Sequence, residues 1–375
     1  MSDAAELPEP DRVEGAPHPR ETSRMFGQSA AEAAFLEAYN SGRLHHAWLL
    51  TGPRGVGKAT LAWALARFLL ATPEADDGGL FGDAPPTPES IDIDPEHPVA
   101  RRIMAGSEPG LKHVTRSPNP KTGRMRDVIS VEDIRALTPF LTLSAAEGGR
   151  RVVIVDSADE MNTQAANALL KMLEEPPAKT VMFLVSHQPS RLLPTIRSRC
   201  RELRLVPLSA EDMRHALDQA METPVEMTDA LAALAAGSVG EAVRLTNLGG
   251  LEIYGALVDL FRDLPKLDRS AALSMAEAAA ARSGEAKLDI LIGMIQLFLA
   301  RLARTGAMAQ PPIPEAAPGE GEMLMRLASD ARHARRWADM AEELGGRMRH
   351  GRAVNLDPAA LILDTIFRIQ QTARG

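Results

Sequence analysis

The sequence predicts a parallel α/β domain with helices on both faces of its sheet, then a small helical lid domain, then an all-helical C-terminal domain. Short apolar runs alternate with helical patterns over residues 23–207, as expected of a parallel sheet covered by helices. Residues 208–248 form a short segment whose apolar residues follow helical spacing. Residues 249–375 are rich in Ala, Leu and Met and show no strand alternation, so we expect an all-helical domain.

Two segments are expected to lie outside these packed domains. Residues 1–22 are rich in Pro and Glu and have no apolar core, which predicts a disordered lead-in and not a secretory signal. Residues 72–98 contain eight acidic residues, six prolines and no Lys or Arg. This composition predicts a flexible acidic insertion.

A glycine-rich phosphate loop opens the α/β domain. Residues 52–58 read Gly-Pro-Arg-Gly-Val-Gly-Lys, which fits the signature G-x-x-x-x-G-K-[ST] as far as its lysine. An apolar strand precedes the loop and a helix with regularly spaced leucines follows it. We therefore expect the backbone at Gly52, Gly55 and Gly57 and the side chain of Lys58 to face nucleotide phosphates. The alternative is a glycine turn that only begins a helix.

The residue after the lysine departs from that signature. Ala59 stands where a Ser or Thr would supply a hydroxyl to Mg²⁺. Thr60 is the next candidate nucleotide-binding residue, but one step along a helix turns a side chain by about 100°. The loop thus predicts recognition of a nucleoside triphosphate and poor hydrolysis.

A second apolar strand ends in the acidic residue that such a site needs. Residues 151–155 run into Asp156, whose carboxylate is expected to face the phosphates. Hydrolysing enzymes of this type usually place a Glu next, to activate water, whereas this chain has Ser157. Without the glycine loop, Asp156 would be interpreted as an ordinary strand-end residue.

Two further motifs resemble one protein family. Residues 167–177 read Asn-Ala-Leu-Leu-Lys-Met-Leu-Glu-Glu-Pro-Pro, and residues 198–200 read Ser-Arg-Cys. With the phosphate loop, these motifs resemble the AAA+ subunits of bacterial sliding-clamp loaders, and among them the delta-prime subunits of DNA polymerase III. The resemblance extends over about residues 25–245. The gamma/tau ATPase subunits of the same group would be expected to keep the Mg²⁺ hydroxyl.

The resemblance assigns roles to two more residues. In that family the arginine of Ser-Arg-Cys reaches into the ATP site of the adjacent subunit, which here implies Arg199 as an arginine finger acting in trans. On composition alone, Arg199 and its neighbouring arginines would be a solvated basic face. Ser186, after the next apolar strand, stands near the family's nucleotide sensor, and its alternative is a plain turn residue.

The chain departs from the family in its metal and arginine positions. Members commonly carry a four-cysteine zinc module after the loop helix, but Cys200 is the one cysteine in this chain. A tetrathiolate zinc site is therefore excluded. No other metal site is expected, because the histidines show no ligand spacing. Hydrolysing members also carry a Gly-Ser-x-Arg pattern, whereas residues 237–240 read Gly-Ser-Val-Gly.

Bulk composition limits the remaining function classes. The net charge of −8 argues against nucleic-acid binding by global charge, so any DNA contact would be local or made within an assembly. A single cysteine implies no disulfide framework and fits a reducing cytoplasm. No apolar run approaches the roughly 20 residues of a membrane span.

The resemblance implies a clamp-loader subunit with little or no ATP hydrolysis of its own. It would work in the cytoplasm with the nucleoid-associated replisome, in a heteropentamer with gamma/tau and delta subunits, joined to them by a C-terminal collar. ATP binding would be weak or without hydrolysis, and the sliding clamp and primer-template DNA would be met through the assembly. Membership of a DNA-directed DNA polymerase complex is implied, although the sequence shows no carboxylate set for nucleotidyl transfer. Two rivals remain: a self-sufficient ATPase using Thr60 with Asp159 or Glu160, and a nucleotide-free scaffold.

Overall fold

The structure is a computed structural model that describes residues 9–72, 87–119, 122–123, 125–142, 149–221, 223–280, 285–354 and 356–374. The chain forms two compact units: Met1–Pro224 with Gly237–Gly240, and Val225–Ala236 with Glu241–Gly375. The helical segment expected at 208–248 is therefore divided between the two units. Most of the acidic insertion lies outside the described residues.

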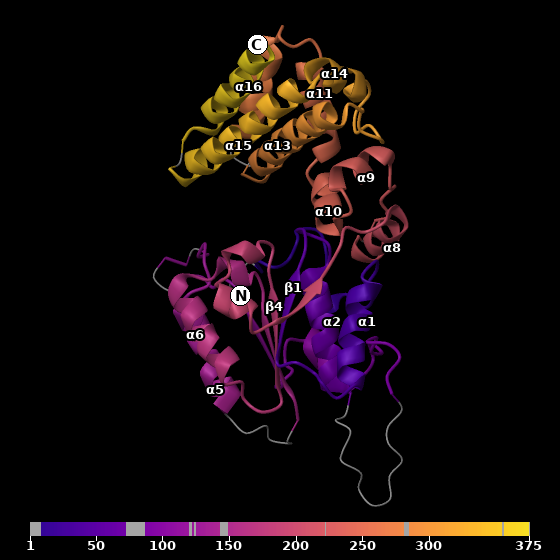
Figure 1. The fold of residues 1–375 in the computed structure, drawn as a ribbon, viewed down its shortest axis with the longest axis vertical. Helices are drawn as coiled ribbons and strands as arrows, with labels where there is room; N and C mark the ends of the chain where they lie inside the picture. Colours follow the sequence, from indigo (N-terminus) through magenta and orange to yellow (C-terminus); the bar gives the residue numbers. More distant parts are fainter. Residues whose placement is uncertain are drawn as a thin grey trace, which may run out of the picture. The chain divides into compact units, whose positions relative to one another are not determined.

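A five-stranded parallel sheet forms the centre of the first unit (Figure 1). The strand order is β2-β3-β4-β1-β5. The strands are β1 (Ala47–Thr51), β2 (Leu111–Val114), β3 (Arg151–Val155), β4 (Thr180–Val185) and β5 (Arg201–Arg204). Every residue of β1 and β4 is buried, as expected of central strands that are covered on both faces.

Helices cover both faces of this sheet, which confirms the predicted fold class. Figure 1 shows α1 and α2 on one side and α5 and α6 on the other. The helices and 3₁₀ turns of this unit are η1 (Pro19–Glu21), α1 (Ser29–Asn40), α2 (Lys58–Ala71), α3 (Pro98–Met104), α4 (Val131–Arg135), α5 (Leu137–Thr142), η2 (Ala158–Glu160), α6 (Thr163–Glu174), η3 (Pro189–Arg191), α7 (Pro194–Arg197) and α8 (Ala210–Ala220).

Helix α6 carries one of the two family motifs and begins after a capping asparagine, Asn162. The side chain of Asn162 accepts a hydrogen bond from Ala165 N at 2.8 Å, which satisfies one of the free amides of the first turn. Ala166, Leu169 and Leu173 of this helix are buried against the sheet. The apolar stripe of the motif is thus part of the core.

The expected disordered lead-in is partly wrong. Residues 9–22 pack on the first unit, whereas residues 1–8 lie outside the described part of the chain. Arg67 of α2 donates from Nη2 to the carbonyl oxygens of Arg20 at 2.9 Å and Thr22 at 3.2 Å. Composition concealed this contact, because the anchor is a buried arginine from a distant helix.

The second unit is helical throughout its described residues. Its helices are α9 (Asp229–Ala235), α10 (Val239–Asn247, which begins in the first unit), α11 (Gly250–Phe261), α12 (Arg269–Ala280), α13 (Glu285–Met308), α14 (Glu320–Leu327), α15 (Ala331–Ala353) and α16 (Pro358–Arg374). Tyr254, Phe298 and Trp337 are fully buried in its core. No helix among the described residues has both the length and the apolar character of a membrane span.

Candidate phosphate-loop site

The phosphate loop joins β1 to α2 at the carboxyl edge of the sheet. Gly52, Gly55 and Gly57 all have positive φ, at 137°, 73° and 96°, a region that favours glycine. A Cβ atom at Gly52 would lie 2.5 Å from the carbonyl oxygen of Leu205. Glycine is therefore needed in this loop for its turns and, at Gly52, for close packing against the backbone of Leu205.

Residues 237–240 lie directly against this loop. Gly240 N donates to Gly55 O at 3.1 Å. A Cβ at Gly55 would lie 2.2 Å from Ser238 Oγ, and a Cβ at Gly240 would lie 3.1 Å from the Cα of Gly55. The position where hydrolysing relatives are expected to carry an arginine is thus closed by a backbone contact.

This contact predicts that Gly55→Ala destabilises the first unit more than Gly42→Ala. Both glycines have similar positive φ, 73° and 69°, so each substitution should cost about 1 kcal/mol of backbone strain. Only Gly55 faces a neighbour, since nothing lies within 4 Å of a Cβ at Gly42. We expect a further loss of about 1–3 kcal/mol for Gly55→Ala from overpacking, measured by denaturant unfolding. Equal losses in the two variants would contradict the close contact.

Lys58 turns back toward its own loop. It is buried at the start of α2, and its Nζ donates to Gly52 O at 2.8 Å and Pro53 O at 2.5 Å. Burial lowers the pKa of Lys58 to about 8, although the carboxylates of Asp156 and Asp159 oppose this shift. Loop carbonyls thus take the donors that a phosphate would otherwise accept.

Asp156 follows β3 at the same edge of the sheet, as predicted. Only 5% of its surface is exposed. Burial, and after it the charge of Asp11, raise the pKa of Asp156 to about 7, although a backbone N–H at Ser157 and the charge of Lys58 oppose the shift. Asp156 therefore shares its buried surroundings with a second carboxylate, that of Asp11.

The acids of the self-sufficient ATPase alternative are engaged in other contacts. Asp159 accepts the N–H groups of His187 and Gln188 at 3.0 and 3.1 Å. Glu160 Oε2 pairs with Arg116 Nε at 3.0 Å. The glycine loop therefore fits a phosphate group in outline, but the residues around it do not fit Mg²⁺ and an activated water.

Ser186 ends β4 beside this group of residues. Its N–H donates to Leu50 O at 3.0 Å, and its buried Oγ makes no hydrogen bond within the described part of the chain. Burial, and after it the charges of Lys58 and Arg54, lower the pKa of the next residue, His187, to about 4. Lys58, His187 and Ser186 thus belong to one site, while the sensor role of Ser186 stays a prediction.

Residues 9–22 bring an unpredicted group of side chains to Asp156. His18 Nε2 lies 2.8 Å and His113 Nε2 lies 3.5 Å from the same oxygen, Asp11 Oδ2. Asp11, His113 and Asp156 each offer one ligand atom, and these atoms lie within 4.8 Å of one another. No sequence spacing links these residues, so only the topology of the sheet could bring them to notice.

Arg199 lies away from the phosphate loop, on the turn between α7 and β5. Its Nη2 pairs with Glu174 Oε1 at 2.8 Å, and its Nη1 donates to Thr195 O at 3.0 Å. Thr51, just before the loop, pairs with Arg204 in the neighbouring parallel strand. Five residues of extended chain separate Arg204 from Arg199, up to roughly 16 Å. Arg199 thus lies toward the amino ends of the strands, whereas the phosphate loop of the same chain lies at their carboxyl ends.

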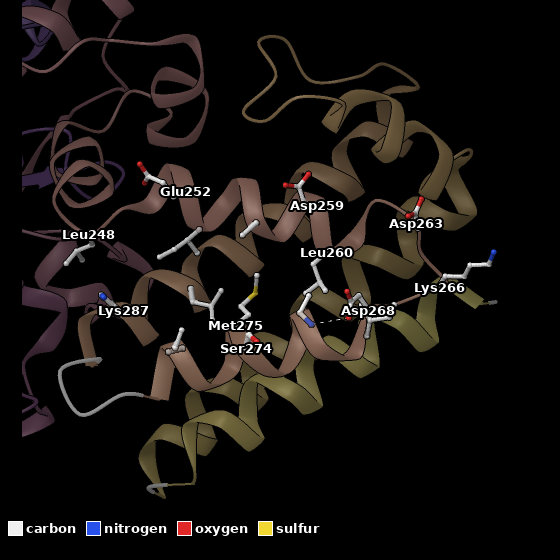
Figure 2. A pocket seen from close by; sticks show the side chains of 17 residues that line it. Leu248, Glu252, Asp259, Leu260, Asp263, Lys266, Asp268, Ser274, Met275 and Lys287 are labelled. Atoms are coloured by element: carbon white, nitrogen blue, oxygen red, sulfur yellow. Dashed lines mark hydrogen bonds between the residues drawn. The ribbon is translucent and has the colours of Figure 1, made fainter.

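A groove of about 1020 Å³ crosses the second unit along α11, α12 and α13. Figure 2 shows side chains from these helices converging on it. Its lining is apolar at Leu260, Met275 and Leu291 and acidic at Glu252 and Asp259. It forms a second candidate site, of the kind that suits another protein surface.

Comparison with known proteins shows which proteins this chain resembles. Residues 27–209 match the family described as DNA polymerase III, delta subunit. The DNA polymerase III subunit delta' of Pseudomonas aeruginosa is 36% identical over 236 residues, which are 62% of this chain and 65% of the relative. The subunit delta' of Escherichia coli is 33% identical over 210 residues, 56% of this chain and 57% of the relative.

A subunit of a second type is more distant. The DNA polymerase III subunit tau of Salmonella typhimurium is 29% identical over 282 residues, which are 73% of this chain and 40% of that protein. The chain thus spans less than two thirds of the length of each of these three relatives. Over the matched region the chain is therefore similar to the delta-prime subunits of DNA polymerase III and, more distantly, to a tau subunit.

Proposed function

We propose that this protein is a clamp-loader subunit that assists ATP-dependent loading of a sliding clamp onto primed DNA without hydrolysing ATP itself. The observation that supports this proposal best is that the phosphate loop and Arg199 lie at opposite ends of the strands of the sheet. The protein's own phosphate loop lacks the Mg²⁺ and water-activating groups. Its Arg199 lies toward the other end of the strands, where a neighbouring subunit could use it.

Each departure from a hydrolysing site has a counterpart in the structure. Ala59 offers no oxygen to Mg²⁺, and Ser157 Oγ contacts His187 Nε2 at 3.2 Å. Backbone atoms of Gly55 and Gly240 occupy the place of a further arginine. Because three elements are altered together, no single substitution is expected to restore turnover.

We therefore expect the purified chain to turn over ATP far below the roughly 1 s⁻¹ of competent enzymes, at any Mg²⁺ concentration. Steady-state phosphate release is the measurement. A matched preparation of Lys58→Ala provides the background rate, since a lysine that serves catalysis cannot be removed without loss. A rate near 1 s⁻¹ that disappears in Lys58→Ala would establish the self-sufficient ATPase instead.

A nucleotide-free scaffold is the second candidate, and one observation favours it. Lys58 Nζ is already satisfied by Gly52 O and Pro53 O. Nucleotide would have to displace both contacts, so we expect weak ATP affinity or none. Equilibrium binding of a labelled ATP analogue, with and without Mg²⁺, separates the two proposals. If Mg²⁺ strengthens the binding, both proposals are contradicted, because both assume that Ala59 removes a Mg²⁺ ligand.

We further propose that the second unit joins this subunit to gamma/tau and delta partners in the assembled loader, in the cytoplasm at the replisome. Its groove supports this proposal, because apolar floors with charged rims are typical of protein interfaces. Contacts with the clamp and with primer-template DNA would be made through the assembly. The net charge of −8 supports this indirect role in DNA binding.

Met275→Glu is expected to weaken assembly with the partner subunits at least tenfold, by about 1.4 kcal/mol or more. The change puts a charge on the apolar floor of the groove. Leu273→Glu is a matched control, because Leu273 is on the same helix, is 46% exposed and does not line the groove. The measurement is the dissociation constant of the reconstituted complex. Equal weakening by both variants would show that the groove is not the interface.

A further inference from the structure

We propose that Asp11, His113 and Asp156 bind a divalent transition-metal ion of the zinc type. The three side chains come from separate parts of the first unit. Asp11 belongs to the segment 9–22, His113 is in β2, and Asp156 follows β3. Their ligand atoms, two carboxylate oxygens and one imidazole nitrogen, lie within 4.8 Å of one another. Imidazole and carboxylate are ligand types that Zn²⁺ accepts.

The ligand atoms are shielded from water, and the imidazole nitrogen of His113 lacks an ordinary partner. The side chain of Asp11 is only 3% exposed, and Asp156 is 5% exposed. His113 Nε2 makes no hydrogen bond within the described residues, and Asp11 Oδ2 has His18 Nε2 beside it at 2.8 Å. A buried polar atom is rarely left without a partner, since its desolvation is then uncompensated. A cation would contact His113 Nε2 and Asp11 Oδ2 at once.

The two histidines stand at different distances from Asp11. The distance to His113 fits metal coordination, and the distance to His18 fits a hydrogen bond. Two tetrahedral ligands at about 2.0–2.1 Å from Zn²⁺ lie about 3.4 Å apart. His113 Nε2 is 3.5 Å from Asp11 Oδ2, close to that value. His18 Nε2 is 2.8 Å from the same oxygen, which is hydrogen-bond distance. His18 is therefore a positioning residue that orients Asp11 and not a ligand.

The ligands are held by ordered elements. β2 and β3 are parallel neighbours, and Asp156 N donates to Val114 O at 2.8 Å, which fixes the two strand ends together. His18 packs edge-on against Trp63 of α2, with ring centroids 5.5 Å apart. Arg67 of the same helix holds the backbone after His18. An ion here would fasten the segment 9–22 to the carboxyl edge of the sheet.

Charge supports a cation at this position. Asp11 and Asp156 are two carboxylates in a buried site, and like charges at this range repel strongly in a medium of low polarity. A divalent ion neutralises both, whereas Lys58, whose charge acts on Asp156, is bonded to its own loop. The ion would also engage Asp156, so it would exclude Mg²⁺-nucleotide from that carboxylate. This inference is independent of the role of Arg199 and of the assembly.

The test is metal binding by the full-length, untagged protein after treatment with a chelator. We expect one Zn²⁺ per chain, measured by competition with a chromophoric chelator, and a Co²⁺ form with the intense visible absorption of tetrahedral coordination. His113→Gln and Asp11→Asn should each weaken Zn²⁺ binding at least 100-fold and abolish that absorption. His18→Gln should weaken binding by about 10–100-fold and keep the tetrahedral spectrum.

His350→Gln is the matched control, since His350 is an exposed histidine of the second unit, and it should bind Zn²⁺ as the wild type does. Thermal unfolding confirms that each variant is folded. Asp156→Asn, which keeps the shape of the side chain, replaces any variant that does not fold. Absence of stoichiometric Zn²⁺ in the wild type, or equal affinity in folded His113→Gln and His350→Gln, would overturn the proposal.

Discussion

Arg199→Ala is expected to lower the clamp- and DNA-stimulated ATPase of the reconstituted loader at least tenfold while leaving this subunit folded. A planar guanidinium that reaches a neighbour's γ-phosphate stabilises the charge of the transition state, and a finger of this kind is worth about 10³–10⁵ in rate at the site that it serves. Other ATP sites in the assembly dilute the measured loss. Arg199→Lys should rescue poorly, because an ammonium lacks the planar fork.

The geometry makes this loss separable from loss of stability. The side chain of Arg199 is 36% exposed, and its partner Glu174 is 44% exposed. An ion pair this open to solvent contributes at most about 1 kcal/mol, so Arg199→Ala should unfold nearly as the wild type does. Arg197→Ala is a matched control two residues earlier, on an exposed arginine. Unchanged turnover in an intact Arg199→Ala complex would return Arg199 to the solvated basic face.

Glu174 connects the two family motifs in space. It ends the helix that carries the family motif, and its carboxylate holds the guanidinium of Arg199 at 2.8 Å. The motif at 167–177 and the triplet at 198–200 therefore meet in space, which the sequence alone did not show. Through this contact the helix of the first motif pairs with the arginine of the second.

The sequence predicts the parts of the site that depend on local spacing. The strand before the loop, the positive-φ glycines and Asp156 at the end of β3 all lie where the pattern indicates. A buried strand and a following turn are determined by neighbouring residues, so short windows suffice.

The remaining parts of the site depend on contacts between distant segments. Asp11 and His113 come together only because residues 9–22 cross the ends of β2 and β3, held there by Arg67. The contact of Gly240 with Gly55 joins two backbones and leaves no trace in side-chain pattern. Composition favoured disorder for a segment rich in Pro and Glu, and a buried arginine with its carbonyl partners outweighed that tendency.

Glu320→Ala is expected to destabilise the helical unit by about 3–5 kcal/mol, the largest stability effect that we predict. Glu320 is completely buried. Its carboxylate accepts from Tyr254 Oη at 2.6 Å, from Arg301 Nε at 2.6 Å and Nη2 at 2.9 Å, and from Ala316 N at 2.7 Å. Removing one partner of a buried ion pair leaves an uncompensated charge, here the guanidinium of Arg301.

Two variants separate that charge from simple loss of contacts. Tyr254→Phe removes one of four donors and leaves the ion pair, so it should cost only about 1–2 kcal/mol. Glu322→Ala, at an exposed position of the same helix, should stay within about 0.5 kcal/mol. Hydrogen exchange of amides in α11, α13 and α14 places the loss in the second unit, because these elements meet at Glu320. If Glu320→Ala exchanges no faster than Glu322→Ala, the buried pair with Arg301 does not stabilise this unit. A small loss of stability would then mean that the second unit relaxes enough for water to reach the guanidinium of Arg301.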